Sequence, residues 1–185
     1  TLEFYVSGRF LELDLTARRN LELTETMRSG EKRGSLLWVL DKTKTAMGSR
    51  MLRSWMERPL LSPKRIERRL GAVEELTQDT VVREELGELL REVSDLERVM
   101  ARVVTGTANA RDLVSFASGC RTLPALHDMA AARKAALFGV LADELDGLAD
   151  LCELVERAIA DEPPFTLREG GIIRAGYNAE LDRLR

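Results

Sequence analysis

The sequence predicts a mainly α-helical protein, and three observations support that prediction. Leu, Ala, Arg and Glu dominate the 185 residues, whereas the aromatic residues that β-sheets favour make up only 5%. Over most of the chain, apolar residues recur at spacings of three and four, the period of a helix with one buried face. Apolar residues reach 44%, which is enough to build a core. We therefore expect a helical bundle, with a short strand or hairpin near the N-terminus and another near residues 165–176.

The first third of the chain is expected to change from strand to helix. β-favouring residues on either side of Ser7-Gly8 predict a strand or hairpin that ends near Leu13. A short helical segment follows from Ser35, and Thr45 is a candidate cap for the next helix. Ser62-Pro63 then combines a capping hydroxyl with proline at the first helical position. The apolar stripes of these last two helices are Met47, Met51, Leu52 and Trp55, ending at Pro59, and Ile66, Leu70, Val73 and Leu76.

Four more helices are predicted between the polar break at 78–80 and residue 160. The first has Val82 to Val93 as its apolar face, and Ser94 with Glu97 reads as a capping box for the second. Asn109 with Asp112 starts the third, which Pro124 kinks or breaks. The fourth covers roughly 137–160, with Gly147 as a weak point. All four are expected to turn apolar faces inward.

The last segment, from Glu162-Pro163-Pro164 onward, is expected to leave the helical pattern. Gly170-Gly171 lies between two β-compatible runs, and positive φ angles are expected there and at Gly176. Asn178 is a good cap for a helix that has only begun at Arg185. We expect residues 178–185 to be the truncated start of a longer helix, because so short a helix is unstable by itself.

Charge is distributed unevenly along the chain. The net charge is −3, but residues 1–70 contain 15 Lys and Arg against 9 Asp and Glu, and residues 71–185 contain 13 against 22. A basic half can face phosphate or an acidic partner, and an Arg-rich solvated helical surface has the same composition. Both interpretations stay open from the sequence.

Catalytic and metal-binding patterns are missing from the sequence. The run from Gly30 to Gly34 is too short for a phosphate-binding loop, and a single histidine, His127, leaves no zinc spacing. Asp143, Glu144 and Asp146 lack the alternating ligands of a calcium loop. Cys120 and Cys152 are expected to be small buried apolar residues. With two cysteines, no signal-peptide pattern and no membrane-length apolar run, we expect a cytoplasmic location.

Several short motifs follow one another along the whole chain. They are Asp14, Thr16, Arg18, Arg19, Asn20 and Leu21 to Leu23; Leu36, Leu40, Asp41, Thr43, Thr45, Gly48, Arg50, Leu52, Trp55 and Pro59-Leu60; Ile66, Arg69 and Val73-Glu74; Asp95 to Arg98; Ala110 to Leu113; and Gly170-Gly171, Ile173, Gly176-Tyr177-Asn178 and Leu181-Asp182. Together these motifs resemble the core, or lever, domain of the MutS family of bacterial DNA mismatch-repair proteins. Ala46 is a small departure, since many members have proline there.

The resemblance implies a domain without an active site inside a larger ATPase. It implies that residues 1–13 are the end of the connector or the first strand of the core, that 14–177 are the helical core, and that 178–185 lead toward the clamp. The segment would mechanically couple the ATPase to the DNA-embracing clamp during mismatch recognition. ATP and Mg would bind elsewhere in the parent protein, whose partners would be mismatched double-stranded DNA, MutL and a second copy of itself, with no membrane.

Two alternatives to this role stay open. One is an autonomous basic DNA-binding module that uses residues 1–70, and the other is the same domain from a recombination-type relative. We expect no catalytic, cofactor or metal residue here, and we hypothesise that charged residues near the start brace the junction between the strand region and the helices. The residues with an expected structural or interdomain role are Asp14, Thr16, Arg18, Arg19, Asn20, Glu22, Asp41, Thr43, Thr45, Gly48, Arg50, Trp55, Gly170, Gly171, Gly176, Tyr177 and Asn178.

Overall fold

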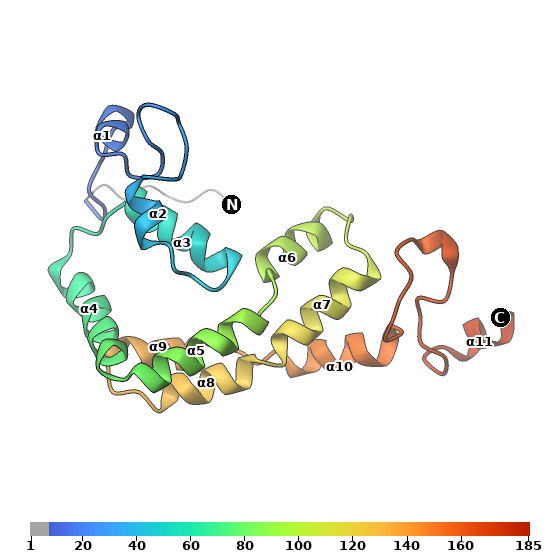
Figure 1. The fold of residues 1–185 in the computed structure, drawn as a ribbon. Coiled ribbons are helices and arrows are strands. Elements are labelled where there is room, and N and C mark those ends of the chain that lie inside the picture. Colours follow the sequence, from blue (N-terminus) through green and yellow to red (C-terminus); the bar gives the residue numbers. More distant parts are fainter. Residues whose placement is uncertain (1–7) are drawn as a thin grey trace. The chain divides into compact units, whose positions relative to one another are not determined.

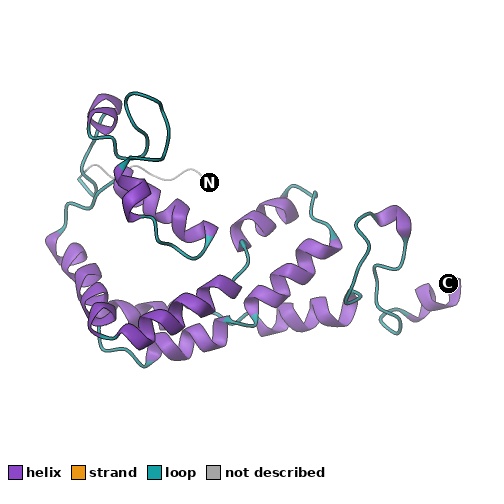
Figure 2. Ribbon diagram, viewed as in Figure 1, coloured by secondary structure: helices purple, strands orange, loops and turns teal. Residues whose placement is uncertain are grey.

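The computed structural model describes residues 8–185, with Leu167 described by its backbone only, and over this range the protein is mainly α-helical (Figures 1 and 2). The predicted fold class is therefore confirmed. The chain divides into two compact units. The first unit is 1–83 with 134–138, and the second is 84–133 with 139–185.

The first unit contains helices that begin at side-chain caps. The predicted cap Thr45 accepts a hydrogen bond from the backbone N–H of Gly48, and Ser35 accepts one from Trp38. One helix was not predicted, α1, which begins because the Asp14 carboxylate accepts the N–H of Ala17. The helices of this unit are α1 (Leu15–Asn20), α2 (Leu36–Leu40), α3 (Ala46–Glu57) and α4 (Pro63–Gln78).

Two details of the first unit differ from the prediction. Ser62 precedes α4 as expected, with Pro63 in the first turn, but its hydroxyl makes no capping hydrogen bond. The described part of the N-terminal segment forms no hairpin. Instead Phe10 makes one antiparallel bridge with Leu60, because the N–H of Leu11 donates to the carbonyl of Pro59 at 2.8 Å. The strand expected before Ser7-Gly8 lies in residues 1–7, outside the described range.

The second unit consists of helices joined by short connections. Asn109 and Asp112 form the capping box expected at the start of α7, and Pro124 lies in the first turn of α8, so the predicted break is present. The helices are α5 (Thr80–Glu92), α6 (Leu96–Val104), α7 (Ala110–Cys120), α8 (Leu123–Ala131), α9 (Ala136–Glu144) and α10 (Ala149–Ala158). The first residues of α5 and of α9 belong to the first unit, so both helices pass from one unit to the other.

In this unit the structure corrects one predicted cap and divides one predicted helix. The cap of α6 is Asp95, whose carboxylate accepts the N–H of Arg98, and not Ser94 with Glu97. The helix expected over 137–160 is two helices, because Leu148 adopts a left-handed conformation (φ +50°) after Gly147. The break covers residues 145–148 and includes Gly147, the predicted weak point, and there the Asp146 carboxylate accepts the N–H of Leu148.

One hydrophobic core lies in the second unit, where α7 packs against α6 and α10. Phe116 and Cys120 are buried on α7, Val99 faces them from α6, and Cys152 faces them from α10. Ala117, Leu123 and Leu126 complete the buried cluster, and α5 adds half-buried leucines at its edge. These residues follow the helical spacing of the sequence, since i, i+3 and i+4 positions share one face.

The C-terminal segment has no hairpin among its described residues. Ile159 and Ile173 make a single antiparallel bridge, and a 3-10 turn, η1 (Leu167–Glu169), fills the interval where a strand was expected. The short α11 (Ala179–Leu184) begins at Asn178, whose side chain accepts the N–H groups of Glu180 and Leu181. The positive φ angles expected at Gly170, Gly171 and Gly176 are confirmed, at +73°, +71° and +85°.

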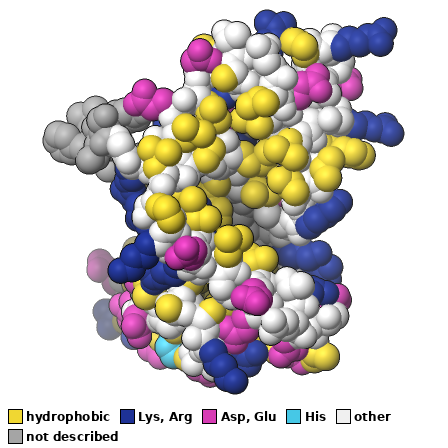
Figure 3. Space-filling view, turned by 90° about the vertical axis from the view of Figure 1, so that its left-hand side faces the viewer, with side chains coloured by type: hydrophobic (Ala, Val, Ile, Leu, Met, Phe, Trp, Pro, Cys, Tyr) yellow, Lys and Arg dark blue, Asp and Glu magenta, His cyan; other side chains and the backbone are white. Residues whose placement is uncertain are grey.

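Many large apolar side chains remain on the surface. Leu15, Val81 and Val104 are more than two thirds exposed, and both tryptophans of the first unit, Trp38 and Trp55, are close to half exposed. Figure 3 shows apolar side chains gathered into patches that Lys and Arg side chains border. Among the described residues, no helix combines the length and apolar character needed to cross a membrane.

Candidate functional site

Asp41 is the centre of a polar network between α2 and α3. Its carboxylate accepts hydrogen bonds from the Lys32 ammonium (2.6 Å), the Thr43 hydroxyl (2.6 Å) and the Ser49 hydroxyl (2.7 Å). The bond from Lys32, followed by those from Thr43 and Ser49, holds the pKa of Asp41 well below its usual range. An ionised acceptor with several donors fixes the geometry of the loops around it. The network ties residue 32 and the start of α3 to the end of α2.

Thr43, Thr45 and Gly48, which the sequence grouped with Asp41, lie at the same place. The Thr45 hydroxyl accepts the Gly48 N–H at 2.9 Å. A Cβ on Gly48 would lie 3.0 Å from that hydroxyl and 3.4 Å from the Thr43 Cβ, so the glycine permits this close turn. Arg50 is exposed on the next turn of α3.

We predict that Asp41→Asn lowers the free energy of unfolding by about 1–2 kcal/mol at pH 7, because a charged acceptor is lost. The depressed pKa means that the stabilisation is complete above the unfolded-chain pKa of about 3.9 and is lost as the pH falls below it. The gap between parent and variant should therefore be smaller at pH 3 than at pH 7. Urea unfolding followed by tryptophan fluorescence measures this, since both tryptophans belong to the first unit.

A matched control is Asp14→Asn in the same unit. Asp14 accepts one backbone N–H as an N-cap, and asparagine caps helices about equally well, so stability should not change at either pH. An Asp41→Asn protein as stable as its parent at pH 7 would show that the network contributes nothing.

The other charged residues predicted near the start serve separate local contacts. The Arg18 guanidinium donates to the Leu13 carbonyl at 2.9 Å, and the Glu22 carboxylate accepts the N–H of Met27 at 2.6 Å. Backbone hydrogen bonds hold residues 22–23 to α2, since the N–H groups of Leu36 and Leu37 donate to the carbonyls of Glu22 and Leu23. Thr16, Arg19 and Asn20 are exposed. These residues line no single site, and charge-assisted bracing of the junction by Asp14, Arg18, Arg19, Glu22, Asp41 and Arg50 stays a prediction.

Trp55 meets a residue that the sequence did not assign to the site. The Arg69 guanidinium of α4 lies over the Trp55 ring, 3.4 Å from its centroid. Burial, and next the charge of Arg65, lower the pKa of Arg69. A guanidinium stacks well on an aromatic face, so this contact holds α4 against α3. The sequence shows the i, i+4 spacing of Arg65 and Arg69, but it does not show that Arg69 stacks on the Trp55 ring.

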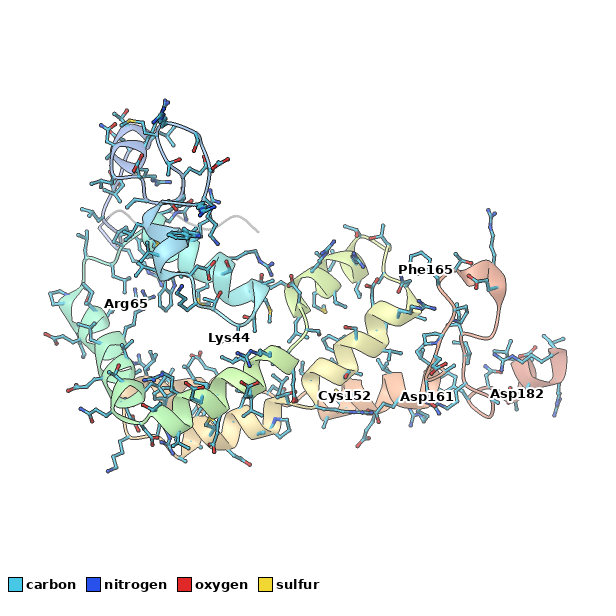
Figure 4. All side chains as sticks on the ribbon, viewed as in Figure 1. Lys44, Arg65, Cys152, Asp161, Phe165 and Asp182 are labelled. Atoms are coloured by element: carbon cyan, nitrogen blue, oxygen red, sulfur yellow. The ribbon has the colours of Figure 1, made fainter. Side chains whose placement is uncertain are left out.

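The C-terminal residues form their own cluster of contacts. Arg174 donates to the carbonyl of Ile159 at 3.2 Å and pairs with Asp161, whose pKa this contact lowers. The Gly176 N–H donates to the Asp182 carboxylate at 2.8 Å, which closes the turn before α11, and Tyr177 is partly exposed in that turn. Figure 4 shows Asp161 and Asp182 in this segment, with Phe165 on the loop between α10 and η1.

Cys120, His127 and the carboxylates are the side chains to consider for chemistry. Burial, and next the neighbouring Cys152, raise the pKa of Cys120 to about 11, so its thiol is protonated at neutral pH. His127 is partly exposed, and its ring nitrogen lies 3.0 Å from an Asp128 carboxylate oxygen. Within residues 8–185, no group of three or more His, Cys, Asp or Glu residues is arranged to hold a metal ion.

A cavity of about 520 Å³ opens beside α7 in the second unit. Its walls include Ser94, Arg111, Gly119 and Glu162. The Arg111 guanidinium is already engaged with the carbonyl of Pro163 at 2.9 Å. The cavity thus offers a groove between helix and loop, with no nucleophile and base in contact.

Comparison with known proteins places these features in a family. The family model described as MutS domain III matches residues 16–185. Proteins named DNA mismatch repair protein MutS are 49% identical over 181 residues in Lachnoclostridium phytofermentans, 49% over 184 in Symbiobacterium thermophilum and 46% over 184 in Bacillus cereus. These alignments cover 98–100% of this chain and 19–21% of the relatives. The chain spans about a fifth of the length of the curated relatives it matches.

Proposed function

Because the chain belongs to the MutS family of DNA mismatch-repair proteins, as their domain III, we propose that it is the lever that couples the ATPase of its parent protein to the clamp that embraces DNA. The observation that supports this role is the close packing of the second unit. α7 contacts both α6 and α10 around one buried cluster, and Gly119 of α7 lies directly against Ser94. Densely packed helices resist deformation, so a displacement at one end reaches the other.

The proposal assigns no chemistry to this segment. ATP and Mg would bind in another domain of the parent protein, and the connector, clamp and ATPase domains would be its contacts within the same chain. Mismatched double-stranded DNA, MutL and a second copy of the parent protein would be its partners in the cytoplasm. The exposed apolar side chains of both units favour such contacts, because extended apolar surface commonly marks an interface.

The lever is tested by weakening a helix that belongs to both units. In the parent protein, Glu85→Gly places glycine at an exposed position of α5, at a cost of about 1 kcal/mol in helix stability. We expect ATP-driven release of a mismatched duplex to slow about fivefold, the factor that corresponds to this energy. Mismatch affinity without nucleotide and ATP hydrolysis without DNA should stay unchanged.

The matched control is Glu153→Gly, at another exposed glutamate, in α10, a helix that lies wholly in the second unit. It has the same helix cost and should leave release unchanged. Equal slowing in both variants would mean that lost stability is responsible, and unchanged release in both would refute the lever.

A further inference from the structure

Basic side chains are concentrated in the segment that contains α3 and the start of α4. Between Lys42 and Arg69 the chain has nine Lys and Arg residues and only two carboxylates, Glu57 and Glu67. Four of the nine lie in the first two turns of α4: Lys64, Arg65, Arg68 and Arg69. We call these four residues the α4 basic face. Figure 4 shows Arg65 beside the start of this helix.

Three of these cations lie on one side of α4. Arg65, Arg68 and Arg69 share a helix face with the buried Ala72, since they precede it by seven, four and three residues. Arg69 is held over the Trp55 ring, which fixes the direction of this side relative to α3. Arg65 and Arg68 remain exposed beside it. The three charges therefore lie on one side of α4, and only that of Arg69 is held in place by a contact.

Within the described residues, the side chains of Lys64, Arg65 and Arg68 have no ion pair or hydrogen bond. Other arginines of the chain have a carboxylate partner, since Arg53, Arg102, Arg121 and Arg174 each contact one.

The position of these cations at the start of α4 is electrostatically unfavourable. The first turn of α4 holds no acidic residue, so the cations face the positive end of the helix dipole. Arg65 also repels Arg69, which helps to lower the pKa of Arg69. A cluster of one sign at such a place is relieved by an anionic partner.

We propose that the α4 basic face binds the phosphate backbone of duplex DNA. This rests on the proposed function in one respect, that the parent protein acts on DNA. Guanidinium groups match phosphate oxygens with two parallel hydrogen bonds. Trp55, the aromatic ring beside the face, is covered by Arg69, so stacking on bases has no platform there. Contacts restricted to phosphates position a duplex without reading its sequence.

A protein partner is less well matched to this face. Protein interfaces depend on buried apolar or aromatic anchors, and Ala72, which shares the side of Arg65 and Arg68, is already buried within this chain. The exposed Ile66, Leu70 and Val73 lie on the adjacent side of α4. An acidic protein segment is therefore an alternative outcome of the experiment and is not the proposal.

The test is the salt dependence of binding by this 185-residue chain to a fluorescein-labelled duplex of arbitrary sequence, measured by anisotropy. Four phosphate contacts predict a slope of log K against log salt of about −3.6, or about 150-fold weaker binding at 200 mM than at 50 mM salt. Arg65→Gln with Arg68→Gln removes two contacts and should reduce the slope to about −1.8. Glutamine keeps the helix propensity of arginine, so α4 should remain folded.

The control variant is Arg98→Gln with Arg157→Gln, which removes two exposed charges from α6 and α10 of the second unit. Its slope should equal that of the parent chain. Absent binding at 50 mM salt, an equal slope loss in the control, or tighter binding of a polyglutamate peptide than of the duplex would each overturn the proposal. None of these results would contradict the proposed lever function, which is tested separately by measuring ATP-driven release in the parent protein.

Discussion

Phe116→Ala is expected to lower the free energy of unfolding of the second unit by about 3–5 kcal/mol, the usual cost of removing a buried aromatic side chain. Phe116 is 8% exposed and lies in the buried cluster with Val99, Cys120 and Cys152, which come from α6, α7 and α10. Removing the ring leaves a cavity where these three helices meet. Such a cavity closes only partly, because each wall belongs to a different helix.

Urea unfolding followed by circular dichroism measures this change, because the second unit is largely helical. Tryptophan fluorescence reports on the first unit alone, since Trp38 and Trp55 are the only tryptophans. A large shift by dichroism with none by fluorescence would show that the two units unfold separately. Coincident shifts would show that they unfold together.

The control for Phe116 is Phe165→Ala in the same unit. Phe165 is 64% exposed, and its ring contacts the Arg111 guanidinium at 5.8 Å, so truncation should change stability by less than about 1 kcal/mol. If the two truncations lower the free energy of unfolding by the same amount, the cluster around Phe116 is not the core of the unit.

Helix positions followed from the sequence because periodicity and caps are local signals. Thr45, Asn109 and Asn178 each begin a helix as predicted, since a cap needs only the backbone N–H groups two or three residues ahead. The choice of Ser94 failed for a related reason. Ser94 and Asp95 are adjacent and both can cap, and Asp95 does so, while Ser94 is packed against Gly119 of α7. That contact is tertiary, so no local pattern reports it.

The residues of the candidate site likewise fall into those that the sequence groups together and those that only tertiary packing brings together. Asp41, Thr43, Thr45 and Gly48 lie within eight residues, so their common location could be inferred from spacing and from the family resemblance. Ser49, the next residue of α3, and Lys32 complete the network, and Lys32 comes from a loop whose path the sequence did not reveal. The Arg69 guanidinium over Trp55 depends on how α3 and α4 cross, which is likewise a property of packing.

The left-handed Leu148 and the isolated bridges were also beyond local patterns. A non-glycine residue at positive φ is disfavoured, and the Asp146 carboxylate beneath its N–H offsets part of that cost. Phe10 pairs with Leu60, and Ile159 with Ile173, over separations too long for a hairpin turn to specify. β-compatible residues indicated extended backbone at these places without indicating the partner.

Gly119→Ala is the second large effect, with an expected loss of about 2–3 kcal/mol from overpacking. A Cβ at this position would lie 2.6 Å from the Ser94 hydroxyl and 2.8 Å from the Ser94 backbone nitrogen. The Ser94 side chain could move away, but the Ser94 nitrogen belongs to the connection between α5 and α6. The helix α7 would therefore have to move away from that connection. In helix interiors alanine is normally better than glycine by about 1 kcal/mol, and here the clash exceeds that gain.

The opposite sign is expected for Gly139→Ala, an exposed glycine of α9 whose Cβ would meet no atom within 4 Å. That change should raise stability by about 0.5–1 kcal/mol. If Gly119→Ala is also stabilising, the close approach of α7 to Ser94 is absent in solution.

A double-mutant cycle with Ser94→Ala separates the two parts of the clash. The Ser94 hydroxyl is buried with no hydrogen-bond partner, so Ser94→Ala alone should be neutral or slightly stabilising. Combined with Gly119→Ala it removes the 2.6 Å contact and leaves the 2.8 Å backbone contact, so it should restore only part of the lost stability. Full restoration would mean that the hydroxyl alone keeps α7 at its distance. No restoration would place the whole cost at the backbone, where only a glycine at residue 119 lets α7 pack this closely.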